Sequence, residues 1–146
     1  MSSLKQLKLE EKSAAQQQQV ILDLNVLVKD IERSEKTISA LKRELERINA
    51  TYQGPRNTRQ DIGYLTGLLE CAKKKLAWEK QIASLQKRTP ALMERMAGII
   101  NDPKNPPSAQ MRDQLLQALQ AIQSAMERLQ TANNSGEAPS PVSPPS

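Results

Sequence analysis

The side chains that do the chemistry of most enzymes are scarce in this sequence of 146 residues. It contains no histidine and a single cysteine, Cys71. Without histidine there can be no Ser-His or Cys-His nucleophile pair and no histidine-ligated zinc. One cysteine excludes an intramolecular disulfide and a cysteine-cluster metal site. Carboxylates such as Glu44 and Glu46 stand among basic residues, and no glycine-rich loop is placed to hold a phosphate. We therefore predict no enzyme, no cofactor, no metal ion and no small-molecule substrate.

Two features remain that could carry regulatory chemistry. We interpret Cys71 as a small, partly buried apolar residue rather than a reactive thiol, which fits a reducing compartment. Ser140 and Ser143 are each followed by proline, which is the pattern of proline-directed phosphorylation, and residues 141–144 match a polyproline ligand. These serines belong to a tail, residues 132–146, that is rich in proline and poor in apolar residues, so we expect it to be disordered.

Basic charge is concentrated in the middle of the chain. The net charge is +5, and residues 53–89 carry eight Lys or Arg against three Asp or Glu. The run Lys73-Lys74-Lys75 spreads over about 200° of a helix, so it is either a solvated face or a contact for an acidic partner. Nucleic-acid binding segments interleave basic residues with aromatics, and only Tyr64 and Trp78 are present here. Trp78 is better suited to packing between helices, which argues against nucleic acid as the partner.

The strongest pattern is a stripe of apolar residues that must lie on one face of a helix. From residue 20 to residue 52 the stripe recurs at alternating gaps of four and three, which is the signature of a coiled coil. Its one polar member, Ser34, either bonds back to the helix backbone or specifies register and partner. We predict a helix interface made by Val20, Leu24, Leu27, Ile31, Ile38, Leu41, Leu45 and Ile48.

Turn-forming residues divide the chain into helices. Gly54-Pro55 should end the first helix, because glycine can adopt the left-handed conformation and proline cannot continue a helix. Thr58 is the expected cap of the next helix, and Thr89-Pro90 either starts a short helix or kinks the second one. Residues 101–107 should form a linker, and Ser108 should cap the last helix. The expected helices cover about 14–52, 57–88, 90–100 and 108–131, after a lead-in of residues 1–13.

The later helices carry stripes of their own. Apolar residues of the second helix again recur at gaps of three and four, and their register slips near Trp78. Gly63 and Gly67 would allow a neighbouring helix to approach closely. The stripe of the last helix is wide enough to pack against two neighbours. The predicted interface residues are Ile62, Leu65, Leu69 and Leu76 in the second helix, and Leu115, Leu119, Ile122, Met126 and Leu129 in the last.

These elements predict an all-α protein. The four-residue connection forces the two long helices to lie antiparallel. We expect an elongated antiparallel coiled-coil hairpin or three-helix bundle over residues 14–131, with a disordered C-terminal tail. The alternative is that the long helices pair with other subunits in an intermolecular coiled coil. Aromatic residues make up only 2% of the sequence, so a single copy would have a small core.

A chain of this kind joins helices to helices. We expect a non-enzymatic coiled-coil subunit or adaptor that binds helical partner proteins or itself, in a centrosomal, microtubule-linked, ciliary or vesicle-tethering assembly. The alternative is a nuclear, chromatin-associated helical protein whose basic segment 56–88 contacts nucleic acid. No apolar run approaches the ~18 residues of a membrane span, and the N-terminus lacks the apolar block of a signal peptide. We therefore expect an intracellular protein and favour the cytoplasm over the nucleus.

Overall fold

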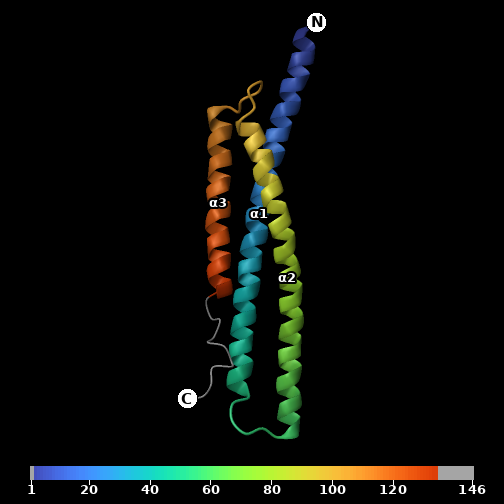
Figure 1. Cartoon of the computed structure of the whole chain (residues 1–146), viewed down its shortest axis with the longest axis vertical. Coiled ribbons are helices and arrows are strands. Elements are labelled where there is room, and N and C mark those ends of the chain that lie inside the picture. The colour runs from blue at the N-terminus through green and yellow to red at the C-terminus, as the bar shows by residue number, and fades with distance from the viewer. Residues whose placement is uncertain (1, 135–146) are drawn as a thin grey trace. The chain divides into compact units, whose positions relative to one another are not determined.

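Three α-helices make up the part of the chain that the structure describes. The computed structural model describes the backbone of residues 2–134 and the side chains of Lys12 and residues 14–134. Helix α1 spans Ser2–Thr51, α2 spans Thr58–Ile100 and α3 spans Ala109–Asn134 (Figure 1). Residues 2–134 contain no strand, so the all-α prediction is confirmed for them. The predicted disorder of the tail beyond Asn134, with Ser140 and Ser143, lies outside the described residues.

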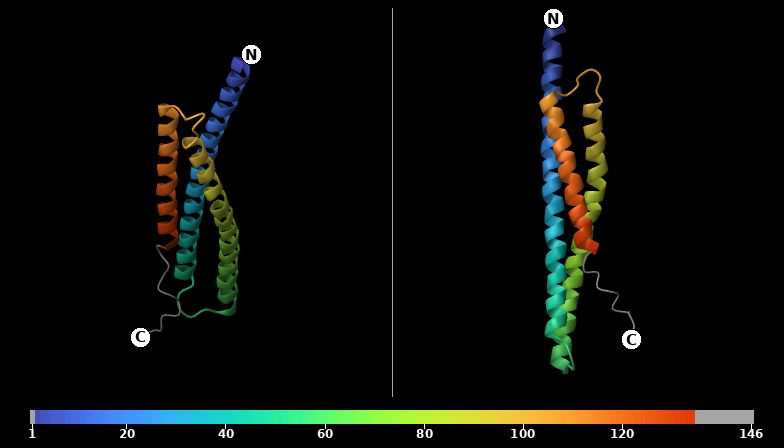
Figure 2. Two further views of the ribbon diagram at one scale, coloured as in Figure 1. Left: turned by 45° about the horizontal axis from the view of Figure 1, so that its top comes forward. Right: turned by 90° about the vertical axis from the view of Figure 1, so that its left-hand side faces the viewer.

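The three helices contribute to two compact units, and each unit takes a segment from every helix. The first unit comprises Met1–Ile31 and Ser84–Met126, and the second unit comprises Glu32–Ala83 and Glu127–Ser146. Within each unit the α1 and α2 segments lie side by side and run in opposite directions (Figure 2). Each unit is therefore a small bundle of helical segments.

The core of the first unit is aliphatic, and two ion pairs join its α1 and α2 segments. Arg95 lies 3.0 Å from Asp23, and Arg88 lies 2.8 Å from Asp30. The two pairs are one heptad apart on both helices and follow opposite directions along them, as expected for antiparallel helices. The buried residues come from all three helices and are Val20, Leu24, Leu27, Ile31, Leu85, Leu92, Met96, Leu115, Ala118, Ile122 and Ala125.

The core of the second unit is built around Trp78. The indole Nε1–H donates a hydrogen bond of 2.9 Å to the backbone carbonyl of Ser34. Both residues are buried, so the small serine side chain leaves room for the indole to reach the backbone of α1. This is a packing role for the one polar residue of the α1 stripe. The other buried residues are Ile38, Leu41, Ile48, Cys71 and Leu129.

The turn between α1 and α2 forms as the sequence predicts, except that a different residue caps α2. Gly54 has φ of 86°, the left-handed conformation expected for it. The cap of α2 is Asn57, one residue before the expected Thr58. The Asn57 side chain accepts a hydrogen bond from the Gln60 amide at 2.9 Å, and the Gln60 side chain accepts one from the Asn57 amide at 3.0 Å. Asparagine caps better than threonine, and only this register gives the reciprocal capping box.

An aromatic cluster closes the same end of the second unit. The rings of Tyr52 and Tyr64 meet edge to face with centroids 5.7 Å apart, and the Arg56 guanidinium lies 4.4 Å from the Tyr64 centroid. Arg56 also bonds to the Tyr52 carbonyl at 2.9 Å and to the Asp61 carboxylate at 2.8 Å. The Tyr64 hydroxyl donates to the Asn49 side chain at 2.9 Å. These contacts join the last turn of α1 to the first turns of α2.

Helix α3 begins as expected and ends later than expected. The Ser108 hydroxyl accepts a hydrogen bond from the Met111 amide at 3.1 Å, so Ser108 is the predicted cap. The helix continues past the expected end at 131 as far as Asn134. Lys42 of α1 donates hydrogen bonds to the carbonyls of Ala132 and Asn133. Carbonyls of a last helical turn have no partner within the helix, and a lysine that supplies one stabilises that turn.

Helix α2 is continuous through Pro90, whereas separate helices over 57–88 and 90–100 were expected. Thr89 does not cap a new helix, because its hydroxyl donates to the Leu85 carbonyl one turn earlier, at 2.7 Å. Proline removes one backbone hydrogen bond, and its ring crowds the carbonyl four residues earlier. Burial of Leu85, Leu92 and Met96 on both sides of it compensates for that loss. Packing has therefore overridden a local stop signal.

Replacement of Pro90 by alanine should stabilise the first unit. Pro90 is exposed, so the substitution removes no core contact. Proline costs about 3 kcal/mol relative to alanine inside a helix, and we expect the variant to gain about 1–3 kcal/mol in its free energy of unfolding. Urea denaturation followed by circular dichroism measures this change. The exposed Ser84→Ala is the control and should change stability by less than about 0.5 kcal/mol. Lower stability of Pro90→Ala would show that the native backbone depends on the proline.

Candidate functional site

The structure buries most of the interface residues predicted on α1 and α3. Leu45, Leu119 and Met126 are half-buried. The remaining members are buried: Val20, Leu24, Leu27, Ile31, Ile38, Leu41, Ile48, Leu115, Ile122 and Leu129. These residues form the cores of the two units, so they are not available to a partner while the chain is folded.

The interface residues predicted on α2 lie on the surface of the second unit instead. The exposed fractions are 61% for Ile62, 62% for Leu65, 55% for Leu69 and 58% for Leu76. Together with the exposed Ala72 they form what we call the α2 stripe, spaced three, four, three and four residues apart. This corrects the expectation that they face α1. The stripe is an aliphatic face that nothing in residues 14–134 covers.

Helix α2 turns a face of mostly smaller residues toward α1. A Cβ atom on Gly67 would lie 3.1 Å from Cδ1 of Ile48, and one on Gly63 would lie 2.6 Å from the Tyr52 hydroxyl oxygen. The two glycines therefore allow the close approach suggested by the sequence. Cys71 continues this face and is 2% exposed. Since one side of a helix faces its neighbour, the larger aliphatic residues on the other side face solvent.

Burial makes Cys71 a poor nucleophile. Loss of hydration raises the pKa of its thiol, and the nearby Glu44 carboxylate raises that pKa further. A thiol is reactive as its thiolate, so a raised pKa lowers reactivity. Cys71 therefore belongs to the packing of the second unit, as the sequence suggested.

The lysine run divides between a surface contact with α1 and the edges of the α2 stripe. The Lys74 ammonium lies 3.0 Å from the Glu44 carboxylate of α1, and this hydrogen bond raises the pKa of Lys74. Lys73 and Lys75, one residue to either side, flank the stripe, and Lys80 continues the edge occupied by Lys73. Among the described residues Lys73 forms an ion pair with Glu70 alone, at 3.6 Å, and 65% of its side chain is exposed. Lys75 and Lys80 form no ion pair with any described residue.

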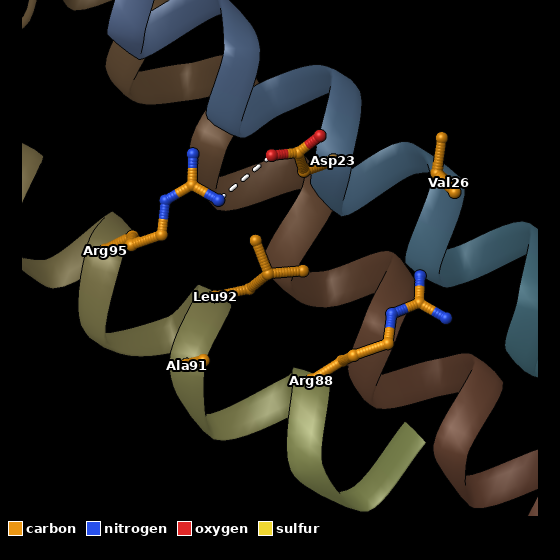
Figure 3. Close-up of a pocket in the computed structure, with 6 residues that line it drawn as sticks. All are labelled: Asp23, Val26, Arg88, Ala91, Leu92 and Arg95. Atoms are coloured by element: carbon orange, nitrogen blue, oxygen red, sulfur yellow. Dashed lines mark hydrogen bonds and ion pairs between the residues drawn. The ribbon is translucent and has the colours of Figure 1, made fainter. Parts of the chain in front are cut away.

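A shallow hollow in the first unit offers a second candidate. It has a volume of about 300 Å³ and is lined by Asp23, Val26, Arg88, Ala91, Leu92 and Arg95. The guanidinium groups of Arg88 and Arg95 lie on either side of Leu92, and Arg95 points at Asp23 (Figure 3). Both arginines are paired with aspartates of α1. Since their charge is already neutralised, the hollow is a seam between helices rather than a site for an anion.

The first unit also exposes aliphatic side chains. Leu22, Val26 and Leu116 of the first unit are 57%, 51% and 43% exposed. Among the residues that the structure describes, no group of three or more acidic or cysteine side chains is placed to hold a metal ion. None of the helices, within the same residues, has an apolar stretch long enough to cross a membrane.

Comparisons with protein-family models, with curated proteins and with solved structures find no match to this chain. Any functional assignment must therefore start from the exposed surface, of which the α2 stripe is the most distinctive part.

Proposed function

We propose that the chain is a non-enzymatic structural or adaptor subunit that binds a helix of a partner protein along the α2 stripe. The observation that carries the proposal is the exposure of four large aliphatic side chains, all more than half exposed, on one face of one helix. Contiguous exposed apolar surface of this kind marks interaction sites in folded proteins. The proposal keeps the function expected from the sequence. Of the predicted interface residues it assigns only those of α2 to the partner, because those of α1 and α3 lie in the cores of the two units.

The spacing of the stripe supports a coiled-coil mode of binding. Ile62, Leu69 and Leu76 are seven residues apart and occupy equivalent heptad positions, with Leu65 and Ala72 between them. A repeat of three and four keeps such a face turned toward one partner helix. A partner helix would thus pack along two heptads of α2 on the outside of the second unit. The opposite face of α2 packs on α1.

The size of the stripe sets the strength that apolar contact alone can provide. Complete burial of a leucine or isoleucine contributes about 1.5–3 kcal/mol, so four residues already about 40% buried would contribute roughly 3–7 kcal/mol. Association costs an estimated 4–15 kcal/mol in lost translational and rotational freedom. The two figures overlap, so apolar burial gives a weak complex at best and the edges of the stripe must add to it.

The same surface gives less support to nucleic acid as the partner. Arg56 is held by Asp61 and stacks on Tyr64, and Lys74 is held by Glu44. The only tryptophan is buried and cannot stack on a base. We therefore place the chain in a protein assembly and, following its composition, propose the cytoplasm as its location.

Site-specific crosslinking tests the proposed function. A photoreactive amino acid is placed at Leu69 in the full chain in cells, and at the exposed Gln81 as a matched position off the stripe. We expect an adduct from position 69 to an apolar position of a helix in a partner protein, with at most a trace from position 81. Mass spectrometry of the linked peptides identifies both residues.

A second variant separates binding from folding. Leu69→Glu should remove the adduct from a photoreactive residue placed at Leu65, while its melting temperature stays within a few degrees of the parent chain, because position 69 is exposed. Equal crosslinking from positions 69 and 81, or undiminished crosslinking in Leu69→Glu, would contradict the proposed function.

A further inference from the structure

We infer that the partner of the α2 stripe is a helix of a different protein whose apolar face is edged by acidic residues, and not a second copy of this chain. The inference rests on the proposed function, because it concerns the occupant of the same site. It is carried by the charges along the two edges of the stripe.

Lysines occupy three of the six positions next to the stripe, all of them between residues 73 and 80. With Ile62, Leu69 and Leu76 at heptad position a and Leu65 at d, position e holds Thr66, Lys73 and Lys80 and position g holds Asp61, Leu68 and Lys75. Side chains at e and g meet those of the partner helix and set partner choice. The half of the stripe nearer Leu76 therefore presents an apolar centre between lysines.

Nothing within the described residues neutralises most of this charge. Lys75 and Lys80 form no ion pair there, and Lys73 is 65% exposed beside Glu70. The one acidic edge residue, Asp61, is bonded to Arg56 at 2.8 Å and so is not free to pair with a lysine across an interface. Acidic side chains on the partner would supply the missing counter-charges.

A second copy would not supply the counter-charges that these lysines lack. In a parallel pair, position g faces position e of the next heptad, so Lys75 of one copy would face Lys80 of the other. In an antiparallel pair, position e faces e and g faces g with the order reversed, so the lysines of one copy face Thr66 and Asp61 of the other. Asp61 is already bonded to Arg56, so it is a poor counter-charge. The like charges disfavour the parallel pair, and the antiparallel pair supplies no free acidic side chain for the lysines. A partner with glutamate or aspartate at its own e and g positions meets lysine in both orientations.

Synthetic helices test the inference with the full chain. Two labelled four-heptad peptides carry isoleucine at a and leucine at d and differ only at e and g, which are glutamate in one and lysine in the other. Fluorescence anisotropy at low salt measures their affinities for the chain. We expect the acidic peptide to bind at least tenfold more tightly, a difference of about 1.4 kcal/mol, and the preference to shrink as salt rises.

Charge-reversal variants assign the preference to the edges. A chain with Lys73→Glu, Lys75→Glu and Lys80→Glu should prefer the lysine peptide. A control chain with the exposed Lys29, Lys36 and Lys104 changed to glutamate has the same net charge and should still prefer the acidic peptide. Circular dichroism shows whether each variant is folded.

The outcomes separate this inference from the function on which it rests. Equal affinity for both peptides, lost in Leu69→Glu, would overturn the acidic partner and leave the helix-binding function standing. Self-association of the chain in sedimentation, lost in Leu69→Glu, would overturn the inference in favour of a second copy. Binding of neither peptide by the parent chain, or binding that survives in Leu69→Glu, would overturn both.

Discussion

Trp78→Ala should lower the free energy of unfolding by about 3–5 kcal/mol, which is the usual effect of removing a large aromatic side chain from a core. Trp78 is 5% exposed, and its removal leaves a cavity against α1. It also removes the indole donor to the Ser34 carbonyl. Because one kcal/mol is a large part of the stability of a small domain, we expect the second unit to be largely unfolded in this variant.

Trp78→Phe separates the two contributions to this loss. Phenylalanine keeps most of the ring but cannot donate a hydrogen bond to Ser34, so its variant should lie between the parent chain and Trp78→Ala. The exposed Glu79→Ala at the neighbouring position is the control and should change stability by less than about 0.5 kcal/mol. Urea denaturation followed by circular dichroism measures all three. A Trp78→Ala variant within 1 kcal/mol of the parent chain would mean that the indole is not part of a packed core.

In the first unit, Leu27→Ala should lower the free energy of unfolding by about 2–5 kcal/mol. Leu27 is 0% exposed and lies in the α1 stripe, so alanine leaves a cavity that the surrounding aliphatic residues fill only in part. The adjacent Val26 is 51% exposed and provides a matched position on the same helix turn.

Val26→Ala should change stability by less than about 0.5 kcal/mol, because most of its side chain is already in water. Thermal and urea denaturation of the two variants therefore test the helix register itself. Equal losses in Leu27→Ala and Val26→Ala would contradict the orientation of α1. A larger loss in Val26→Ala would place the buried face one residue earlier.

The buried face of α1 could be predicted because this helix has one apolar stripe. Over residues 20–48 no other face of the helix carries as many large apolar residues as this stripe. The periodicity alone therefore determines which side is buried. Helix α2 has two candidate faces. One carries Ile62, Leu65, Leu69 and Leu76, and the other carries Gly63, Gly67, Cys71 and Trp78. Periodicity finds both faces but cannot choose between them, and the more hydrophobic face was expected inside.

Close packing decided against the more hydrophobic face. Near the turn α2 approaches α1 so closely that Cβ atoms on Gly63 and Gly67 would touch Tyr52 and Ile48. Leucine at those positions would not fit. The two glycines were the available signal in the sequence, and a preference for small residues where helices meet would have selected the correct face. The residues of the α2 stripe could thus be predicted to lie at a helix interface, but not that this candidate interface is on the side of α2 that faces away from α1.

Helix ends could be predicted only where the local sequence determines them. Gly54 and Ser108 act through their own backbone or side chain, and both behave as expected. The end of α3 depends instead on Lys42, which is 90 residues before the Ala132 carbonyl that it binds. Continuation of α2 through Pro90 depends on the burial of residues on either side. Contacts between distant segments are not visible in a local pattern.

The positions of Trp78 and Cys71 also make the two units separately observable. The chain has one indole and one thiol, and both are buried in the second unit. Fluorescence and thiol labelling therefore report on that unit alone, whereas circular dichroism records the helices of both. Comparison of the three signals along one denaturation curve distinguishes a single cooperative transition from stepwise melting, without any engineered probe.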